Sequence, residues 1–112
     1  MRLALVSALL LALAAVVLAL AAPAFAQDPI TLTIRNNQFV PAEVQVPAGQ
    51  RVELVIKNEQ ATPAEFESTS LHREKVVAAG ATVSVFIGPL KPGRYEFFDD
   101  FHPATRGILV AQ

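Results

Sequence analysis

The sequence predicts a small all-β domain, a sandwich or small barrel of seven to eight short strands that follows an N-terminal export signal. Through most of the chain after residue 26, apolar residues alternate with polar ones, which is the period of strands that bury one face. Turn-forming residues interrupt this alternation at short intervals, at Pro47-Ala48-Gly49, Ala79-Gly80 and Lys91-Pro92-Gly93. Short strands at such spacing are typical of β-sandwiches and small barrels.

The first 26 residues have the pattern of a secretory signal peptide. Arg2 supplies the positive charge, Leu3 to Ala22 is apolar except for Ser7, and Ala24-Phe25-Ala26 matches a signal-peptidase site. We therefore expect residues 1–26 to be a signal peptide and residues 27–112 to form the exported domain. The apolar stretch is about long enough to cross a bilayer, so an uncleaved membrane anchor is the alternative.

The exported part is one small, slightly acidic domain. The whole chain has 112 residues, with nine basic and ten acidic side chains, and only Arg2 of these lies in the signal segment. The domain has no room for a large substrate cleft and no basic run that would bind nucleic acid. The chain has no cysteine, which excludes disulfide bonds and a lipoprotein anchor.

Six segments carry the strand pattern, and their apolar members are expected to face the core. These pairs and triplets are Leu32 and Ile34; Val44 and Val46; Val52, Leu54 and Ile56; Val83, Val85 and Ile87; Tyr95 and Phe97; Ile108 and Val110. Residues 58–75 depart from the alternation. There we expect a loop over 58–63, a short strand over 65–67 and a polar connection over 71–75, without relying on a helix at 71–77.

Two short segments concentrate side chains that could bind a cation. In Glu65-Phe66-Glu67 the two carboxylates are two residues apart and therefore lie on one face of a strand. Asp99-Asp100-Phe101-His102 follows an apolar strand, and carboxylates held between phenylalanines are costly without a positive partner. The sequence therefore predicts a metal site built from a subset of Glu65, Glu67, Asp99, Asp100 and His102.

Carboxylates with at most one imidazole suit iron, manganese or oxidised copper. His72, beside Arg73 and Lys75, is a weaker candidate for a ligand or for a proton acceptor near the site. The alternative is a solvated turn, since acidic pairs are common in surface loops. The chain lacks a cysteine nucleophile, a phosphate-binding glycine loop and a serine elbow. The sequence therefore gives no catalytic motif for acyl or phosphoryl transfer.

Three segments resemble the framework motifs of the cupredoxin-like superfamily, and the resemblance extends over residues 29–111. They are Asn36-Asn37-Gln38-Phe39-Val40-Pro41-Ala42-Glu43, Val46-Pro47-Ala48-Gly49 and Leu90-Lys91-Pro92-Gly93-Arg94-Tyr95-Glu96-Phe97. The resemblance implies a Greek-key β-sandwich. It does not fix the metal, because copper-binding and copper-free members share these motifs.

The resemblance also implies where copper ligands would lie, and this chain lacks the set. Asp99 stands where blue-copper members have a cysteine, and His102 matches the histidine that follows it. Ala64 or Glu65 occupies the position of the upstream histidine, and residues 104–106 offer no methionine. A type 1 copper centre requires the thiolate, so we expect neither a blue protein nor a conventional electron carrier.

The departures resemble the periplasmic cupredoxin-like proteins associated with ferrous-iron uptake beside an inner-membrane iron permease. The segments that carry this resemblance are Glu65-Phe66-Glu67-Ser68, Leu71-His72-Arg73-Glu74-Lys75 and Phe97-Phe98-Asp99-Asp100-Phe101-His102-Pro103. The resemblance implies a periplasmic protein that binds an iron or copper ion and assists iron oxidation or delivery to the permease. Iron at Glu65, Glu67 and Asp99 would be held by hard oxygens that favour the ferric state.

Two other functions remain open at this stage. A periplasmic copper-binding or copper-delivery protein would bind cupric ion more tightly than ferric ion. A metal-free sandwich that acts as an interaction module would show no change of melting temperature on addition of either metal. A stand-alone enzyme is not expected, and any turnover would be ferroxidase-like and dependent on a partner.

Overall fold

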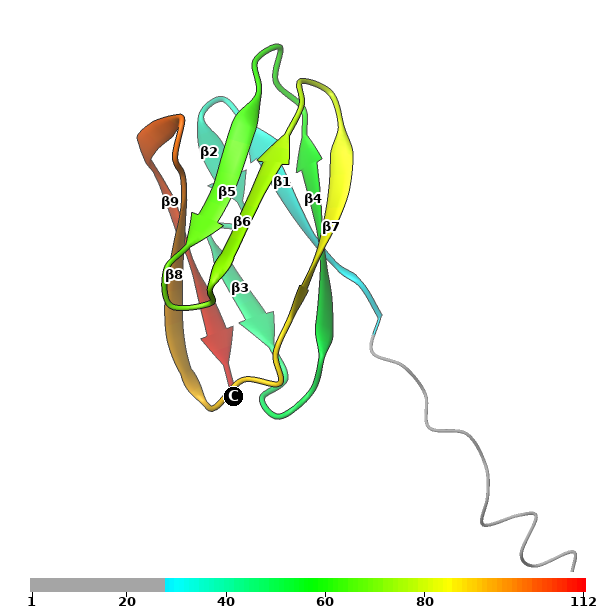
Figure 1. Cartoon of the computed structure of the whole chain (residues 1–112), viewed down its shortest axis with the longest axis vertical. Helices are drawn as coiled ribbons and strands as arrows, with labels where there is room; N and C mark the ends of the chain where they lie inside the picture. The colour runs from blue at the N-terminus through cyan, green and yellow to red at the C-terminus, as the bar shows by residue number, and fades with distance from the viewer. Residues whose placement is uncertain (1–27) are drawn as a thin grey trace, which may run out of the picture.

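The computed structural model describes residues 28–112, and these form nine β-strands in two facing sheets (Figure 1). The predicted signal peptide lies outside the described residues. The all-β sandwich predicted from the sequence is confirmed, with nine strands where seven to eight were expected. In residues 28–112, no helix has the length and apolar character needed to cross a membrane.

The two sheets each combine strands from distant parts of the chain. The four-stranded sheet has the order β2-β1-β4-β7, and the five-stranded sheet has the order β3-β9-β8-β5-β6. Pairing is antiparallel except for β1 with β4 and β3 with β9, which are parallel. The strands are β1 Ile30–Arg35, β2 Gln38–Val40, β3 Glu43–Val46, β4 Val52–Asn58, β5 Ala64–Ser68, β6 Arg73–Val77, β7 Thr82–Ile87, β8 Gly93–Asp99 and β9 His102–Ala111.

The core lies between the sheets and is built from the alternate apolar residues that the sequence predicts. Leu32, Ile34, Leu54 and Ile56 are fully buried on the four-stranded sheet. On the five-stranded sheet, Phe97 packs edge-to-face on Phe39, with ring centroids 4.9 Å apart, and lies 5.3 Å from Phe66. These rings occupy the middle of the sandwich and fix the inner face of β5 and β8.

Two strand predictions differ from the structure for identifiable reasons. The expected polar connection at 71–75 contains the start of β6, an edge strand whose first four residues are exposed. An edge strand of this kind shows no apolar alternation. Over the last four residues of β9, Leu109 and Ala111 are buried, whereas Ile108 and Val110 are only half-buried. All four residues from Ile108 to Ala111 are apolar, so the alternation of apolar and polar residues could not show which of them face the core.

Gly107 should not tolerate a side chain. It pairs with Phe97 across β8 and β9, and a Cβ atom would overlap the Phe97 ring and lie 3.0 Å from the Ala42 carbonyl oxygen. We expect G107A to lower the free energy of unfolding by about 1–3 kcal/mol through overpacking, as measured by urea denaturation. In the control variant G93A the nearest atoms are 3.7 Å away, so stability should be nearly unchanged. Equal losses in both variants would refute the packing argument.

Candidate metal centre

The turn between β8 and β9 is fastened to the beginning of β5. The Asp100 amide donates to the Glu65 carbonyl oxygen at 2.9 Å, and the Glu65 amide donates to Asp99 Oδ1, also at 2.9 Å. Figure 1 places this turn and the start of β5 at the same end of the sandwich. Residues 34 positions apart in the chain are thereby held side by side.

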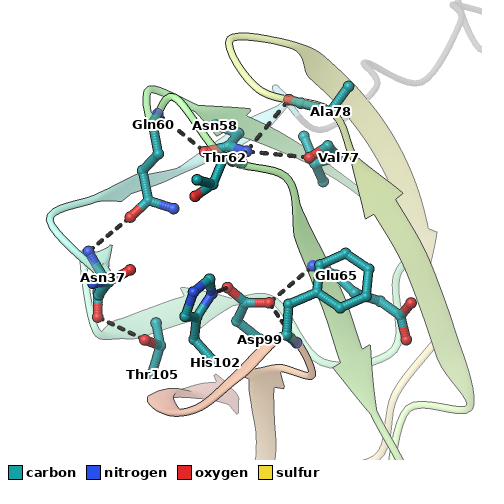
Figure 2. A network of polar contacts seen from close by, with 11 residues as sticks. Asn37, Asn58, Gln60, Thr62, Glu65, Val77, Ala78, Asp99, His102 and Thr105 are labelled. Atoms are coloured by element: carbon teal, nitrogen blue, oxygen red, sulfur yellow. Dashed lines mark hydrogen bonds and ion pairs between the residues drawn. The ribbon is translucent and has the colours of Figure 1, made fainter.

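Asp99 is the centre of this attachment. Its side chain is 1% exposed and lies on the inner side of the sheet, opposite Phe66 in the β5–β8 register. Oδ1 also accepts a hydrogen bond from the Phe101 amide at 3.0 Å, and Oδ2 lies 3.1 Å from His102 Nδ1 (Figure 2). The Asp99 carboxylate is therefore fully engaged by groups of the protein itself, which offsets the cost of its burial.

The outer face of the same sheet carries a cluster of three carboxylates. Glu65, Glu67 and Asp100 each offer an oxygen atom, and these atoms all lie within 4.8 Å of one another. Oxygens bound to one cation at about 2.0–2.6 Å are at most about 4–5 Å apart, so a single ion can contact all three. Figure 2 shows the Glu65 amide directed at Asp99 while the Glu65 carboxylate points away from it.

The end of β8 separates the neighbouring aspartates. Asp99 is the last residue of the strand and is buried, whereas Asp100 is an exposed residue of the following turn, held beside β5 by its hydrogen bond to the Glu65 carbonyl oxygen. Glu65 and Glu67 alternate with the buried Phe66 along β5 and lie on the outer face, because successive side chains of a strand point to opposite faces. The third carboxylate beside Glu65 and Glu67 is therefore Asp100, and not the Asp99 of the sequence-based iron hypothesis.

Glu74 adds a fourth acidic side chain to this face. It is directly opposite Glu67 in the β5–β6 register. Its hydrogen bond with Glu65, together with desolvation and the charges of Glu74, Asp100 and Glu67, raises the pKa of Glu65 from 4.5 to about 7. Desolvation and the Asp100 charge also raise the pKa of Glu67. Repulsion among like charges thus makes full ionisation of the cluster unfavourable in the absence of a cation.

None of the ion pairs within residues 28–112 neutralises this cluster. The pairs found there are Arg35 with Glu59, Arg94 with Glu43, and His102 with Asp99. Glu65 is 9% exposed as a residue, and desolvation is one of the causes of its raised pKa. A bound cation would supply the missing positive charge.

The six predicted site residues divide into two groups and one outlying member. Glu65, Glu67 and Asp100 form the outer carboxylate cluster, and Asp99 and His102 form the inner pair. His72 lies in the β5–β6 turn with a φ of 53°, and it lines a shallow pocket of about 280 Å³ together with Glu67 and Glu74. His72 is thus near the cluster without belonging to the three residues that can share an ion.

Two residues that shape this end of the sandwich, Glu74 and the buried Asn58, are not among the site residues predicted from the sequence. Asn58 Nδ2 donates to the carbonyl oxygens of Thr62 and Val77, at 2.9 and 3.1 Å, and so fixes the loop before β5 (Figure 2). The position of Glu74 depends on the β5–β6 register, which a single sequence does not reveal. For Asn58, a clue was available in its place at the end of an alternating strand, just before a proline-containing loop.

Comparison with known proteins agrees with this architecture. The family model described as a cupredoxin-like domain matches residues 7–111. The chain belongs to the cupredoxin-like family. Among curated proteins, it is 39% identical over 82 residues to an uncharacterised protein of Rickettsia prowazekii; the match spans 72% of this chain and 66% of that protein.

Solved cupredoxin structures share the fold at low sequence identity. Auracyanin from Roseiflexus castenholzii superposes with a TM-score of 0.65 and 15% identity, covering 79% of this chain and 99% of that one. Amicyanin from Paracoccus versutus gives a TM-score of 0.61 and 20% identity, covering 84% and 88%. At these identities the likeness establishes the fold alone.

The inner pair of this cupredoxin-like domain does not fit a type 1 copper ion. Such a centre needs a thiolate ligand, and the chain has no cysteine. The carboxylate of Asp99 already accepts two backbone hydrogen bonds and contacts His102 directly. The contacts of Asp99 and His102 therefore anchor the β8–β9 turn to β5.

Removal of the Asp99 carboxylate should destabilise the fold. In D99A the buried amide of Glu65 and the partly buried amide of Phe101 lose their acceptor, which we expect to lower the free energy of unfolding by about 2–4 kcal/mol. The amide oxygen of D99N can still accept both hydrogen bonds, so this variant should lose much less. Urea denaturation at neutral pH measures the difference in stability. Equal stability of D99A and wild type would contradict the anchoring role of Asp99.

The raised pKa of Glu65 makes the stability of the metal-free protein depend on pH. A carboxyl group whose pKa is higher in the folded state stabilises the fold when protonated, and this contribution is lost as pH rises. In chelator-treated buffer, we expect the melting temperature to fall between pH of about 4.5 and about 7. E65Q should flatten this decline, and a wild-type slope in E65Q would show that another group is responsible.

Proposed function

We propose that this cupredoxin-like protein binds a hard metal ion, preferentially iron, through the outer carboxylates of Glu65, Glu67 and Asp100. The observation that carries the proposal is the convergence of these three oxygens within 4.8 Å, from segments more than 30 positions apart in the chain. The pKa of Glu65 supports it, because the hydrogen bond with Glu74, desolvation and the charges of neighbouring carboxylates together raise it to about 7.

The ligand chemistry favours ferric over ferrous iron. Anionic oxygen ligands stabilise the ion of higher charge, so they lower the reduction potential of bound iron and ease its oxidation. Oxidation of each ferrous ion releases one electron, which dioxygen or a neighbouring copper centre would accept. The protein would contribute the hard ligands, and ferric ion would be the product held by the cluster.

We further propose that the protein acts in the periplasm and hands iron to an inner-membrane iron permease. The support for this setting is the resemblance of Glu65-Phe66-Glu67-Ser68 and the β8–β9 turn to iron-uptake proteins, together with the signal-peptide pattern of residues 1–26. A surface cluster suits transfer, because a partner can approach ions held on an exposed sheet face.

Metal titration of single variants tests the site. Wild-type protein is expected to bind one ferrous ion under argon. E67Q and D100N should weaken binding by at least about tenfold, since even the loss of an indirect partner of a metal ligand typically costs 10–100-fold. The control variant E53Q changes a glutamate on β4 of the other sheet and should bind as wild type does.

Titrations with ferric ion and with cupric ion separate the iron function from the copper alternative. Ferric affinity above cupric affinity supports iron handling, and cupric affinity above ferric affinity would favour copper delivery. Ferrous ion is not used for this comparison, because divalent copper binds more tightly than divalent iron at most protein sites. Unchanged stoichiometry and affinity in both E67Q and D100N would eliminate the outer cluster as the site. Failure of wild type to bind either metal would leave the interaction module as the better account.

A further inference from the structure

The outer face carries a second charged feature beside the carboxylate cluster. A surface pocket of about 340 Å³ is lined by Thr69, Ser70, Arg94, Glu96, Phe98 and Arg106. It brings two guanidinium groups and two hydroxyl groups to one hollow. Guanidinium groups bind carboxylates through paired, charge-assisted hydrogen bonds, so this lining is suited to a small anion with carboxylate groups.

The strand register places this pocket next to the carboxylate cluster. Phe98 on β8 is paired with Glu67 on β5 and with Arg106 on β9. Directly paired residues of adjacent strands share a face, and neighbouring strands are about 4.8 Å apart, so Glu67 and Arg106 are separated by about 10 Å. Thr69 lines both this pocket and the pocket that contains Glu67 and Glu74. The two hollows are therefore adjacent.

Arg106 is positioned for an additional ligand. Its guanidinium carbon lies 5.0 Å from the centre of the Phe98 ring, which holds the side chain over the outer face of the sheet. Among the ion pairs of residues 28–112, none includes Arg106. Arg94 contacts Glu43 at 3.4 Å with both side chains more than half exposed, a weak pair that an anion can replace.

Glu96 makes the pocket selective. It lies between Arg94 and Phe98 along β8, on the same face, and leaves the pocket with a net charge of one positive unit. Its carboxylate repels a polyanion that has no hydrogen-bond donor, but it can accept a hydrogen bond from a ligand hydroxyl. A ligand with both carboxylate and hydroxyl groups therefore matches the lining best.

We propose that this pocket binds a small hydroxypolycarboxylate, of the chemical class of citrate, that is itself a ligand of the metal ion. The inference rests on the proposed metal site, and it specifies that the ion reaches this site as a complex with the chelator. Three protein carboxylates leave coordination positions on the ion for a chelator, whose free carboxylate would lie toward Arg106. Arg94, whose guanidinium contacts Glu43 on β3, lines the side of the pocket that is farther from the cluster. The Arg106 guanidinium would offset repulsion between the chelator and the acidic cluster.

Equilibrium dialysis with radiolabelled citrate tests this proposal. Wild-type protein given ferric citrate should retain iron and citrate together, and citrate without iron should be retained much less. R106Q should lower citrate retention by about tenfold, a loss equivalent to about 1.4 kcal/mol. It should still bind ferrous ion under argon as wild type does. The control variant R51Q also removes a guanidinium stacked on a phenylalanine, Phe86, but on the other sheet, and should retain citrate.

The outcomes separate this inference from the metal site itself. Iron retained by wild type without citrate, or citrate retention in R106Q equal to that of wild type, would overturn the chelate pocket and leave the metal site intact. Failure of wild type to bind ferrous ion and ferric citrate alike would overturn both. Loss of citrate in R51Q as well as R106Q would show a general charge effect and would also overturn the pocket.

Discussion

The buried carboxylate of Asp99 is the constraint on which the candidate site depends. Its hydrogen bonds to the amides of Glu65 and Phe101 join the β8–β9 turn to the start of β5. This attachment fixes Asp100 on the opposite side of the backbone, where it meets Glu65 and Glu67. One acidic residue therefore has a structural role, and its neighbour becomes available to bind a cation.

This arrangement changes how the cupredoxin-like framework would hold a metal. Asp99, which the sequence resemblance matches to the cysteine of blue-copper proteins, uses its carboxylate to bind the protein's own amides and His102. The carboxylates that lack such partners lie on the outer face of the five-stranded sheet, where the hydrogen bond with Glu74, desolvation and neighbouring carboxylates raise the pKa of Glu65 to about 7. A cation there relieves repulsion that the apo protein otherwise relieves by binding protons.

Much of the fold, but only part of the site, could be predicted from the sequence. Alternation located most strands and correctly placed Phe66 opposite Glu65 and Glu67. It failed for β6, whose first four residues are exposed, and for Ile108, which lies in a segment that is apolar in both phases. The division between Asp99 and Asp100 depends on hydrogen bonds between distant segments, and the approach of Glu74 depends on strand register, so neither follows from local pattern.

The position of a bound metal ion tests this account most directly. Crystals of the protein loaded with iron would show the ion in an anomalous difference map. We expect one peak on the outer face, within bonding distance of carboxylate oxygens of Glu65, Glu67 and Asp100, with the hydrogen bonds of Asp99 unchanged. A peak between Asp99 and His102, accompanied by loss of their direct contact, would contradict the assignment of a structural role to Asp99 and of metal binding to the outer carboxylates.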